Sequence, residues 1–269
     1  MQLNPYQIPF YGYQIKSISA KESNAIALST NGVVFTWGNN SRIVSSDDNV
    51  SGFVSSCVPI IVNELYQHKH VISNVYCGER FFVVTSLDTY NLLTWGQWCA
   101  YTQYSNHILR VCGMHLGLSR KIHQVSCTDK NTYCLLTSGV IYFWKNWECH
   151  GQKLPQQTPI QIQNIPFIRS ISSGKTHSAC IDIHGNVYVW GIITSPDIIN
   201  QPHTPLLIGS SNDHIQYTQV KCGIDSLVVL DNHKYIHCWG KNTCNKLSDN
   251  NITVFHQLTK MDGDNRLDF

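Results

Sequence analysis

The feature that most constrains the fold is a tryptophan that recurs every 46 to 58 residues along the chain. Glycine follows this tryptophan in four of its five occurrences, and lysine (Lys145) follows it in the third. A small side chain stands 17 or 18 residues before each tryptophan. A unit repeated in this way predicts equivalent modules, each burying its apolar face against a neighbour. The tryptophans are Trp37, Trp95, Trp144, Trp190 and Trp239, and the small residues are Ala20, Cys77, Cys127, Ser173 and Cys222.

Each repeat reads as a β-hairpin. In the first repeat "NAIAL" and "VVFTW" are the two strands, and in the fourth "SACID" and "VYVW" are. The stretches that join them, such as "STNG" and "IHGN", supply residues suited to the positive φ angles of hairpin turns. The pattern therefore predicts an all-β fold. A β-branched residue also stands two places before each small residue, at Ile18, Val75, Val125, Ile171 and Val220.

The polar residues of the fourth repeat look at first like an active site, because His177 precedes Cys180 by three positions. Residues three apart on a strand point to opposite faces, so a histidine base beside a cysteine nucleophile is not expected there. The eleven cysteines form no C-x-x-C pair, which favours reduced thiols over disulfides or a metal site. Packing is the preferred role for five cysteines, because small or apolar residues hold the same positions in other repeats. Cys77, Cys127 and Cys222 share their position with Ala20 and Ser173, whereas Cys134 and Cys180, which we call the cysteine column, share theirs with Ala27, Val84 and Val229.

Composition and motifs exclude several classes. The formal charge is +2 without a basic cluster, so no nucleic-acid partner is expected. No apolar run is long enough for a membrane span, and the first residues do not read as a secretory signal. No Gly-rich phosphate loop, G-x-S-x-G or H-E-x-x-H motif occurs, so no catalytic residue and no cofactor are predicted. His233 and His237 are expected on one face of a strand, but without a third ligand no metal site is predicted.

Several stretches resemble the repeat of the regulator of chromosome condensation family. They are "VYCG", "VKCG", "STNGVVFTWGNN", "CWGKN" and "ISSGKTHSACIDIHGNVYVWG", and together they cover roughly residues 15–245. The family repeat leads from Ser/Ala-Cys-Gly-x-x-His-Ser/Thr to Asp-Gly-x-Val/Leu-Tyr/Phe-x-Trp-Gly-x-Asn. The chain carries neither the Trp-Asp of WD blades nor the Gly-Gly doublet of kelch blades.

The resemblance implies a β-propeller with one four-stranded antiparallel blade per repeat. We expect about five blades, or six or seven if some repeats are too diverged to read, in one domain over residues 1–269. Pro-containing segments are the expected outer strands, at 58–62, 158–162 and 204–208. Residues 254–259 are expected to take this role and to close the ring by joining the N-terminal blade. The repeat cores are about 15–38, 72–96, 122–145, 168–191 and 217–240, with a closing segment at about 251–260.

Function is expected in the connections between hairpins, which carry the variable side chains of propellers. The connection 39–57 is polar and includes paired acids, whereas 97–121 is rich in aromatic residues and arginine, the usual anchors of protein interfaces. The alternatives are a solvated loop for the first and the outer strand of a blade for the second. The candidate partner-binding residues are Asp47, Asp48, Trp98, Tyr101, Tyr104 and Arg110.

The namesake of the family is a guanine-nucleotide exchange factor for the Ran GTPase. The resemblance therefore implies a monomeric protein-binding propeller for a Ran-like small GTPase, with exchange as its only expected activity. A pure scaffold or inhibitor module is the alternative, since no exchange residue of the family matches a stretch here. We expect a cytoplasmic protein, in a host cytosol if it is a pathogen effector, with the nucleus as the other compartment.

Overall fold

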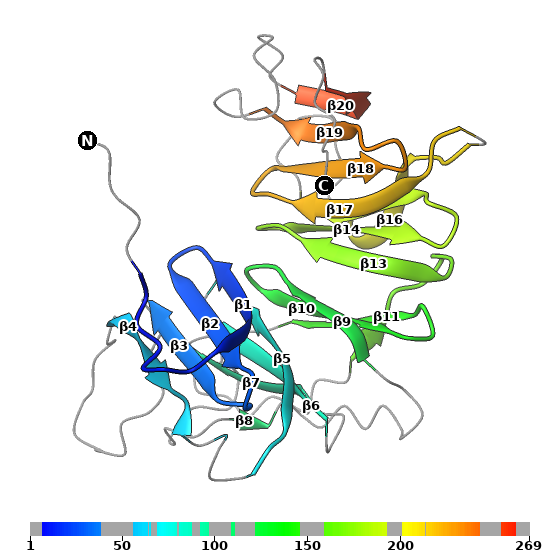
Figure 1. The fold of residues 1–269 in the computed structure, drawn as a ribbon. Helices are drawn as coiled ribbons and strands as arrows, with labels where there is room; N and C mark the ends of the chain where they lie inside the picture. The colour runs from blue at the N-terminus through cyan, green and yellow to red at the C-terminus, as the bar shows by residue number, and fades with distance from the viewer. Residues whose placement is uncertain are drawn as a thin grey trace. The chain divides into compact units, whose positions relative to one another are not determined.

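The computed structural model describes residues 7–38, 56–63, 65, 69–79, 81–87, 92–96, 109–110, 122–145, 159–192, 201–212, 214–242 and 254–261. Within these ranges the chain folds into five four-stranded antiparallel sheets (Figure 1). Each sheet takes its four strands in sequence order, which is the blade architecture of a β-propeller. The predicted all-β propeller fold is confirmed.

The five sheets, numbered here as blades along the chain, follow the predicted repeats. Blade 1 contains β1 (Ile15–Lys21), β2 (Asn24–Ser29), β3 (Val34–Gly38) and β4 (Ser56–Ile61). Blade 2 contains β5 (Ile72–Cys77), β6 (Phe81–Ser86), β7 (Leu92–Gly96) and β8 (Leu109–Arg110). Blade 3 contains β9 (Ile122–Cys127), β10 (Asn131–Leu136), β11 (Ile141–Lys145) and β12 (Ile160–Gln161).

The last two blades have longer outer strands. Blade 4 contains β13 (Ile168–Ser173), β14 (His177–Asp182), β15 (Val187–Gly191) and β16 (Gln201–Gly209). Blade 5 contains β17 (Tyr217–Cys222), β18 (Ser226–Asp231), β19 (Ile236–Lys241) and β20 (Val254–Lys260). Contacts divide the chain into two compact units, residues 1–119 with 145–158, and 120–144 with 159–269. A single domain over residues 1–269 therefore stays a prediction.

The repeated tryptophan has the same place in every blade, near the end of the third strand. Trp239 pairs with Leu227 of the second strand, and Trp95 and Trp190 pair with their second strands in the same way. Four of the five indoles are buried, and Trp37 of blade 1 is half-buried. The prediction of five equivalent hairpins is confirmed.

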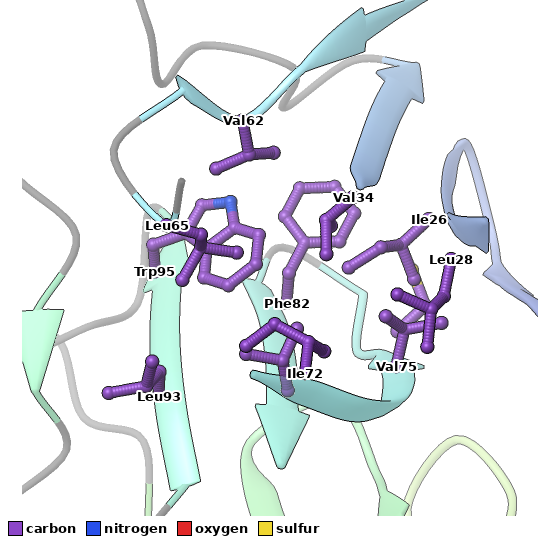
Figure 2. Close-up of a cluster of buried hydrophobic side chains, with 12 residues drawn as sticks. Ile26, Leu28, Val34, Val62, Leu65, Ile72, Val75, Phe82, Leu93 and Trp95 are labelled. Atoms are coloured by element: carbon purple, nitrogen blue, oxygen red, sulfur yellow. The ribbon is translucent and has the colours of Figure 1, made fainter. Parts of the chain in front are cut away.

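Within each compact unit, neighbouring blades pack face to face. In the first unit, Ile26, Leu28 and Val34 of blade 1 meet Ile72 and Phe82 of blade 2 in one apolar cluster (Figure 2). In the second unit, equivalent clusters join blade 3 to blade 4 and blade 4 to blade 5. We call the side of a blade that packs on the next blade its forward face, and the side that packs on the preceding blade its rear face. Burial of these faces supplies the main stabilising term.

Hydrogen bonds between blades repeat with the sequence. The Ser19 hydroxyl accepts the backbone N–H of Cys77 at 3.0 Å, and the Ser172 hydroxyl accepts that of Cys222 at 3.0 Å. These serines directly precede the small residues of their own repeats. The same position therefore links blade 1 to blade 2 and blade 4 to blade 5. Repetition extends beyond the hairpins to the contacts between them.

The outer strands confirm one expectation and correct another. The three Pro-containing segments lie at β4, β12 and β16, as predicted. Residues 254–259 lie in β20, which pairs with β19 through Cys238 and Thr259. The expected joining of this segment to the N-terminal blade is therefore wrong. Pairing with the strand just before it in the chain leaves a shorter loop to close, which costs less chain entropy.

The four hairpin turns that the structure describes, in blades 1, 3, 4 and 5, share one backbone requirement. Their third residue has a positive φ angle, and it is glycine in blades 1, 3 and 4, at Gly32, Gly139 and Gly185. In blade 5 it is Lys234, with φ of 71°. A side chain in this left-handed region clashes with the neighbouring carbonyl oxygen, whereas glycine does not.

Replacing Lys234 with glycine is expected to raise the free energy of unfolding by about 0.5–1 kcal/mol. Relief of the left-handed strain exceeds the entropy that glycine adds to the unfolded chain. Urea unfolding followed by circular dichroism measures the change. Gly185→Lys is the matched control and is expected to destabilise, because a Cβ at Gly185 would lie 3.1 Å from the Tyr217 amide nitrogen. A loss of stability in Lys234→Gly would contradict this account.

Candidate interaction surface

The polar residues of the fourth repeat build the fold. Cys180 is fully buried, and burial, followed by the nearby Asp182, raises the pKa of its thiol well above the usual range. A protonated thiol is a poor nucleophile. His177 begins β14 and is also fully buried. It shares a strand face with Ala179, which packs in a different apolar cluster from Cys180, so His177 and Cys180 lie on opposite faces of the sheet. The predicted packing role of this stretch is confirmed.

The other described cysteines agree with that role. Burial raises the pKa of Cys134 to about 12 and that of Cys238 to about 11. Within the described ranges all the cysteines are free thiols, and Cys57 is the exposed one. The cysteine column and its apolar equivalents are almost completely buried. The buried cysteine side chains therefore contribute to packing.

The structure corrects the prediction for the two histidines of the fifth repeat. His237 lies on β19, whereas His233 lies in the hairpin turn, so they do not share a strand face. The Asp231 carboxylate organises this turn, because its Oδ1 atom accepts the backbone N–H groups of His233 and Tyr235 at 2.8 and 2.9 Å. The two histidines do not share a strand face because a turn, rather than a strand, occupies residues 232–234.

His237 and Asp231 form a buried pair that the sequence did not reveal. The His237 Nε2 atom lies 2.9 Å from Oδ2 of Asp231, and both side chains are buried. Burial opposes ionisation of the Asp231 carboxyl, but the hydrogen bonds from His237 and from the two backbone N–H groups outweigh it and lower its pKa. Asp182 accepts the same two turn N–H groups in blade 4. Because Asp182 and Asp231 hold the same position in their repeats, this recurrence is the sequence signal that points to a structural aspartate.

The glycine after the repeated tryptophan determines how the third strand ends. Gly38, Gly191 and Gly240 have φ angles between 98° and 112°. A Cβ at Gly191 would lie 2.5 Å from the Thr176 carbonyl oxygen, and one at Gly240 would lie 2.6 Å from that of Asp225. The third strand therefore ends directly against the loop between the first two strands of its own blade.

Blades 4 and 5 form a candidate surface at this edge, which we call the loop edge. Ile192 is 48% exposed at the end of blade 4, where its backbone N–H donates to the Thr176 carbonyl oxygen at 3.0 Å. Ile224 is 53% exposed in the corresponding loop of blade 5. The two loops are adjacent, because a Cβ at Gly174 would collide with the Gly223 carbonyl oxygen. Exposed isoleucines on adjacent loops are suited to protein contact.

Most of the predicted partner-binding residues fall outside the described residues. They are Asp47, Asp48, Trp98, Tyr101 and Tyr104. Arg110 lies on β8, where it pairs with Leu93, so its backbone belongs to the outer strand of blade 2. This position agrees with the alternative that was open for residues 97–121. The role of the six residues in partner binding stays a prediction.

Within the described part of the chain, no three His, Cys, Asp or Glu side chains gather as they would around a metal ion. No helix found in that part is long and apolar enough to cross a membrane.

Comparison with known proteins supports the repeat assignment. Residues 15–42, which hold the hairpin of blade 1, match the family model described as the regulator of chromosome condensation (RCC1) repeat. The chain is thus similar to RCC1 repeat proteins. It is 23% identical to the mouse RCC1-like G exchanging factor-like protein over 85% of this chain and 54% of that protein. The chain thus spans about half the length of the curated relatives it matches.

Solved structures of the RCC1 type share this fold. Human WBSCR16 aligns with a TM-score of 0.72 and 18% identity, covering 93% of this chain and 67% of that one. Prp20p of Saccharomyces cerevisiae, described together with its binding properties to Gsp1p and histones, aligns with a TM-score of 0.61 and 17% identity. That alignment covers 84% of this chain and 57% of Prp20p. At these identities the likeness shows the β-propeller fold.

Proposed function

We propose that this chain is a protein-binding RCC1-type propeller that engages a small GTPase of the Ran type and promotes release of its nucleotide. The observation that carries the proposal is that the polar side chains within the blades serve the fold. Cys180, Asp182 and His177 are buried or bound in turns, so partner contact falls to the connections and the loop edge. The names of its relatives, a G exchanging factor-like protein and the Gsp1p-binding Prp20p, support a GTPase as the partner.

In this proposal, exchange works by displacement and needs no covalent chemistry. Acidic side chains at Asp47 and Asp48 compete for the lysine or Mg²⁺ that holds the nucleotide phosphates in the GTPase. Trp98, Tyr101 and Tyr104 provide aromatic anchors that hold the partner, as aromatic side chains commonly do in interfaces. The propeller blades contribute a stable frame for these connections.

Release of a fluorescent guanosine diphosphate from a panel of small GTPases tests the proposal. Catalytic amounts of the chain are expected to accelerate release from a Ran-type member. Asp47→Lys with Asp48→Lys is expected to reduce the acceleration by about tenfold or more, because like charges then meet the phosphate-binding lysine. Trp98→Ala with Tyr101→Ala is expected to weaken binding by about thirtyfold.

Leu206→Ala is the control for these variants, since Leu206 lies exposed on the outer strand β16 of blade 4. It is expected to retain full binding and release. If no GTPase in the panel binds, the partner class is wrong. If the two double variants behave like Leu206→Ala, the assignment of the connections is wrong.

A scaffold or inhibitor module without exchange activity is the second candidate. It is favoured by the burial of the described thiols, other than Cys57 and the half-buried Cys222, and by the structural use of Asp182 and Asp231. Tight binding without accelerated release distinguishes it from the first candidate. We propose the cytosol as the site of action in either case, a host cytosol if the chain serves as a pathogen effector.

A further inference from the structure

Blade 4 has an exposed apolar pair at the edge that carries the hairpin turns, which we call the turn edge. The residue after the second strand donates its backbone N–H to the carbonyl oxygen of the residue just before the first strand, and this bond recurs in blades 1, 2, 4 and 5. In blade 4 the pair is Ile183 and Phe167, which are 53% and 47% exposed. Blades 1 and 5 carry polar pairs at this position, so packing of a blade does not require apolar side chains there. The pairs are Thr30 with Gln14, Leu87 with Val71, Ile183 with Phe167, and Asn232 with Gln216.

The neighbours of this apolar pair lie in the same compact unit. Blade 4 packs on blade 3 with its rear face and on blade 5 with its forward face. A Cβ at Gly139, in the hairpin turn of blade 3, would lie 2.5 Å from the Phe167 ring. On the other side, the Gly185 carbonyl oxygen accepts the backbone N–H of Tyr217, at the start of blade 5, at 3.2 Å. These residues all belong to the second unit, so the turns of blades 3, 4 and 5 form one continuous surface.

The exposed charges of this surface are positive. Arg169 is exposed, and its Nη2 atom donates to a carbonyl oxygen at the start of β17 at 2.8 Å, which holds the guanidinium between blades 4 and 5. Lys234 is exposed in the hairpin turn of blade 5. The described aspartates of these turns, Asp182 and Asp231, are buried and accept turn N–H groups. Asp213, in the sequence before β17, lies outside the described residues.

We propose that the turn edge of blades 4 and 5 binds an acidic peptide that carries an apolar side chain. The apolar side chain packs on Phe167 and Ile183, and the acidic residues pair with Arg169 and Lys234. Packed sheets lie about 10 Å apart and an extended chain advances about 3.3 Å per residue, so the acidic residues are expected about three positions from the apolar anchor. An anionic membrane is a weaker fit, because each exposed cation contributes only about 1 kcal/mol there.

The turn edge lies at the opposite end of the blades from the loop edge. The second strand of blade 4 begins next to Thr176, whose carbonyl oxygen accepts the Ile192 N–H at the loop edge, and it ends at the hairpin turn. The two surfaces are therefore separate, and the peptide site does not depend on the GTPase proposal.

Fluorescence anisotropy of synthetic fluorescein-labelled peptides tests this proposal. The peptides combine Leu and Phe with paired Glu residues at varied spacing, and control peptides replace Glu with Lys, or Leu and Phe with Ser. The acidic apolar peptides are expected to bind, and both control sets are expected to bind at least about tenfold more weakly. Ile183→Asp is expected to weaken binding by about thirtyfold, because a carboxylate then meets the apolar anchor and the peptide acids. Lys234→Glu is expected to weaken binding by about tenfold and to reduce its dependence on salt.

Leu87→Asp is the matched control, since Leu87 holds the same position in blade 2 and is 56% exposed. It is expected to leave peptide binding unchanged. Three results would overturn the proposal: no acidic apolar peptide binds, Ile183→Asp binds as tightly as the wild type, or vesicles that contain phosphatidylserine bind in place of the peptides. Circular dichroism of each variant confirms that it is folded before binding is measured.

Discussion

Replacing Trp239 with alanine is expected to lower the free energy of unfolding by about 3–5 kcal/mol. The indole is 1% exposed and belongs to the apolar cluster between blades 4 and 5, together with Val189 of blade 4 and Leu227 of blade 5. Its removal loses the transfer free energy of the ring and leaves a cavity that the surrounding sheet fills only partly. Urea unfolding followed by far-ultraviolet circular dichroism gives the change without relying on tryptophan fluorescence.

Trp37→Ala is the matched control for this prediction. Trp37 holds the same place in blade 1 but is half-buried, so its truncation removes less area from the core. Its contact with Phe10 adds an aromatic pair worth only about 0.5–1.5 kcal/mol. The loss in Trp239→Ala should therefore clearly exceed the loss in Trp37→Ala. Equal losses would mean that burial between blades does not set the contribution of the repeated tryptophan.

The second large effect is expected at Asp231, where alanine should lower the free energy of unfolding by about 3 kcal/mol. The substitution leaves the turn N–H groups of His233 and Tyr235 and the Nε2 atom of His237 without their carboxylate partner. Each buried polar group that loses its hydrogen bond costs about 1–3 kcal/mol. Adding Lys234→Gly to this variant is expected to recover about 0.5–1 kcal/mol, because a relaxed turn depends less on the carboxylate.

The contribution of Asp231 also depends on pH, with a definite sign. Folding lowers the pKa of this carboxyl, so the ionised form is favoured in the native state. Its contribution is fully present above its ordinary pKa of about 4 and is lost as the pH falls through the lowered native value. The stability advantage of the wild type over Asp231→Asn should therefore shrink as the pH falls below about 4. An advantage that grows on acidification would reverse the assignment.

The hairpins were predictable because their signal is local. The spacing of tryptophan, glycine and the small residues fixes strand, turn and strand within about twenty residues, and five copies reinforce one another. Cys134 and Cys180 could be assigned to packing because their column holds alanine and valine in other repeats. The same reasoning failed at His233 and His237. There the strand was extended across a turn that a buried aspartate stabilises.

The candidate surface was less predictable than the fold, because exposure depends on neighbours that lie elsewhere in the chain. Ile192 and Ile224 do not stand out in the sequence, where isoleucine is usually a core residue. The structure makes them candidate contact residues, because Gly191 and Gly240 hold the strand ends against the loops of blades 4 and 5. Arg110 stands out in the sequence as a candidate anchor, but its backbone belongs to the outer strand of blade 2.

The sequence by itself determined the repeated β-hairpins, the positions of the buried tryptophans and the RCC1-type fold, because those properties follow from side-chain size, turn chemistry and spacing within each repeat. Only the tertiary structure decided which strand β20 joins, that Asp231 holds His237, and that Phe167 and Ile183 are exposed. These outcomes depend on which surface each residue meets after folding.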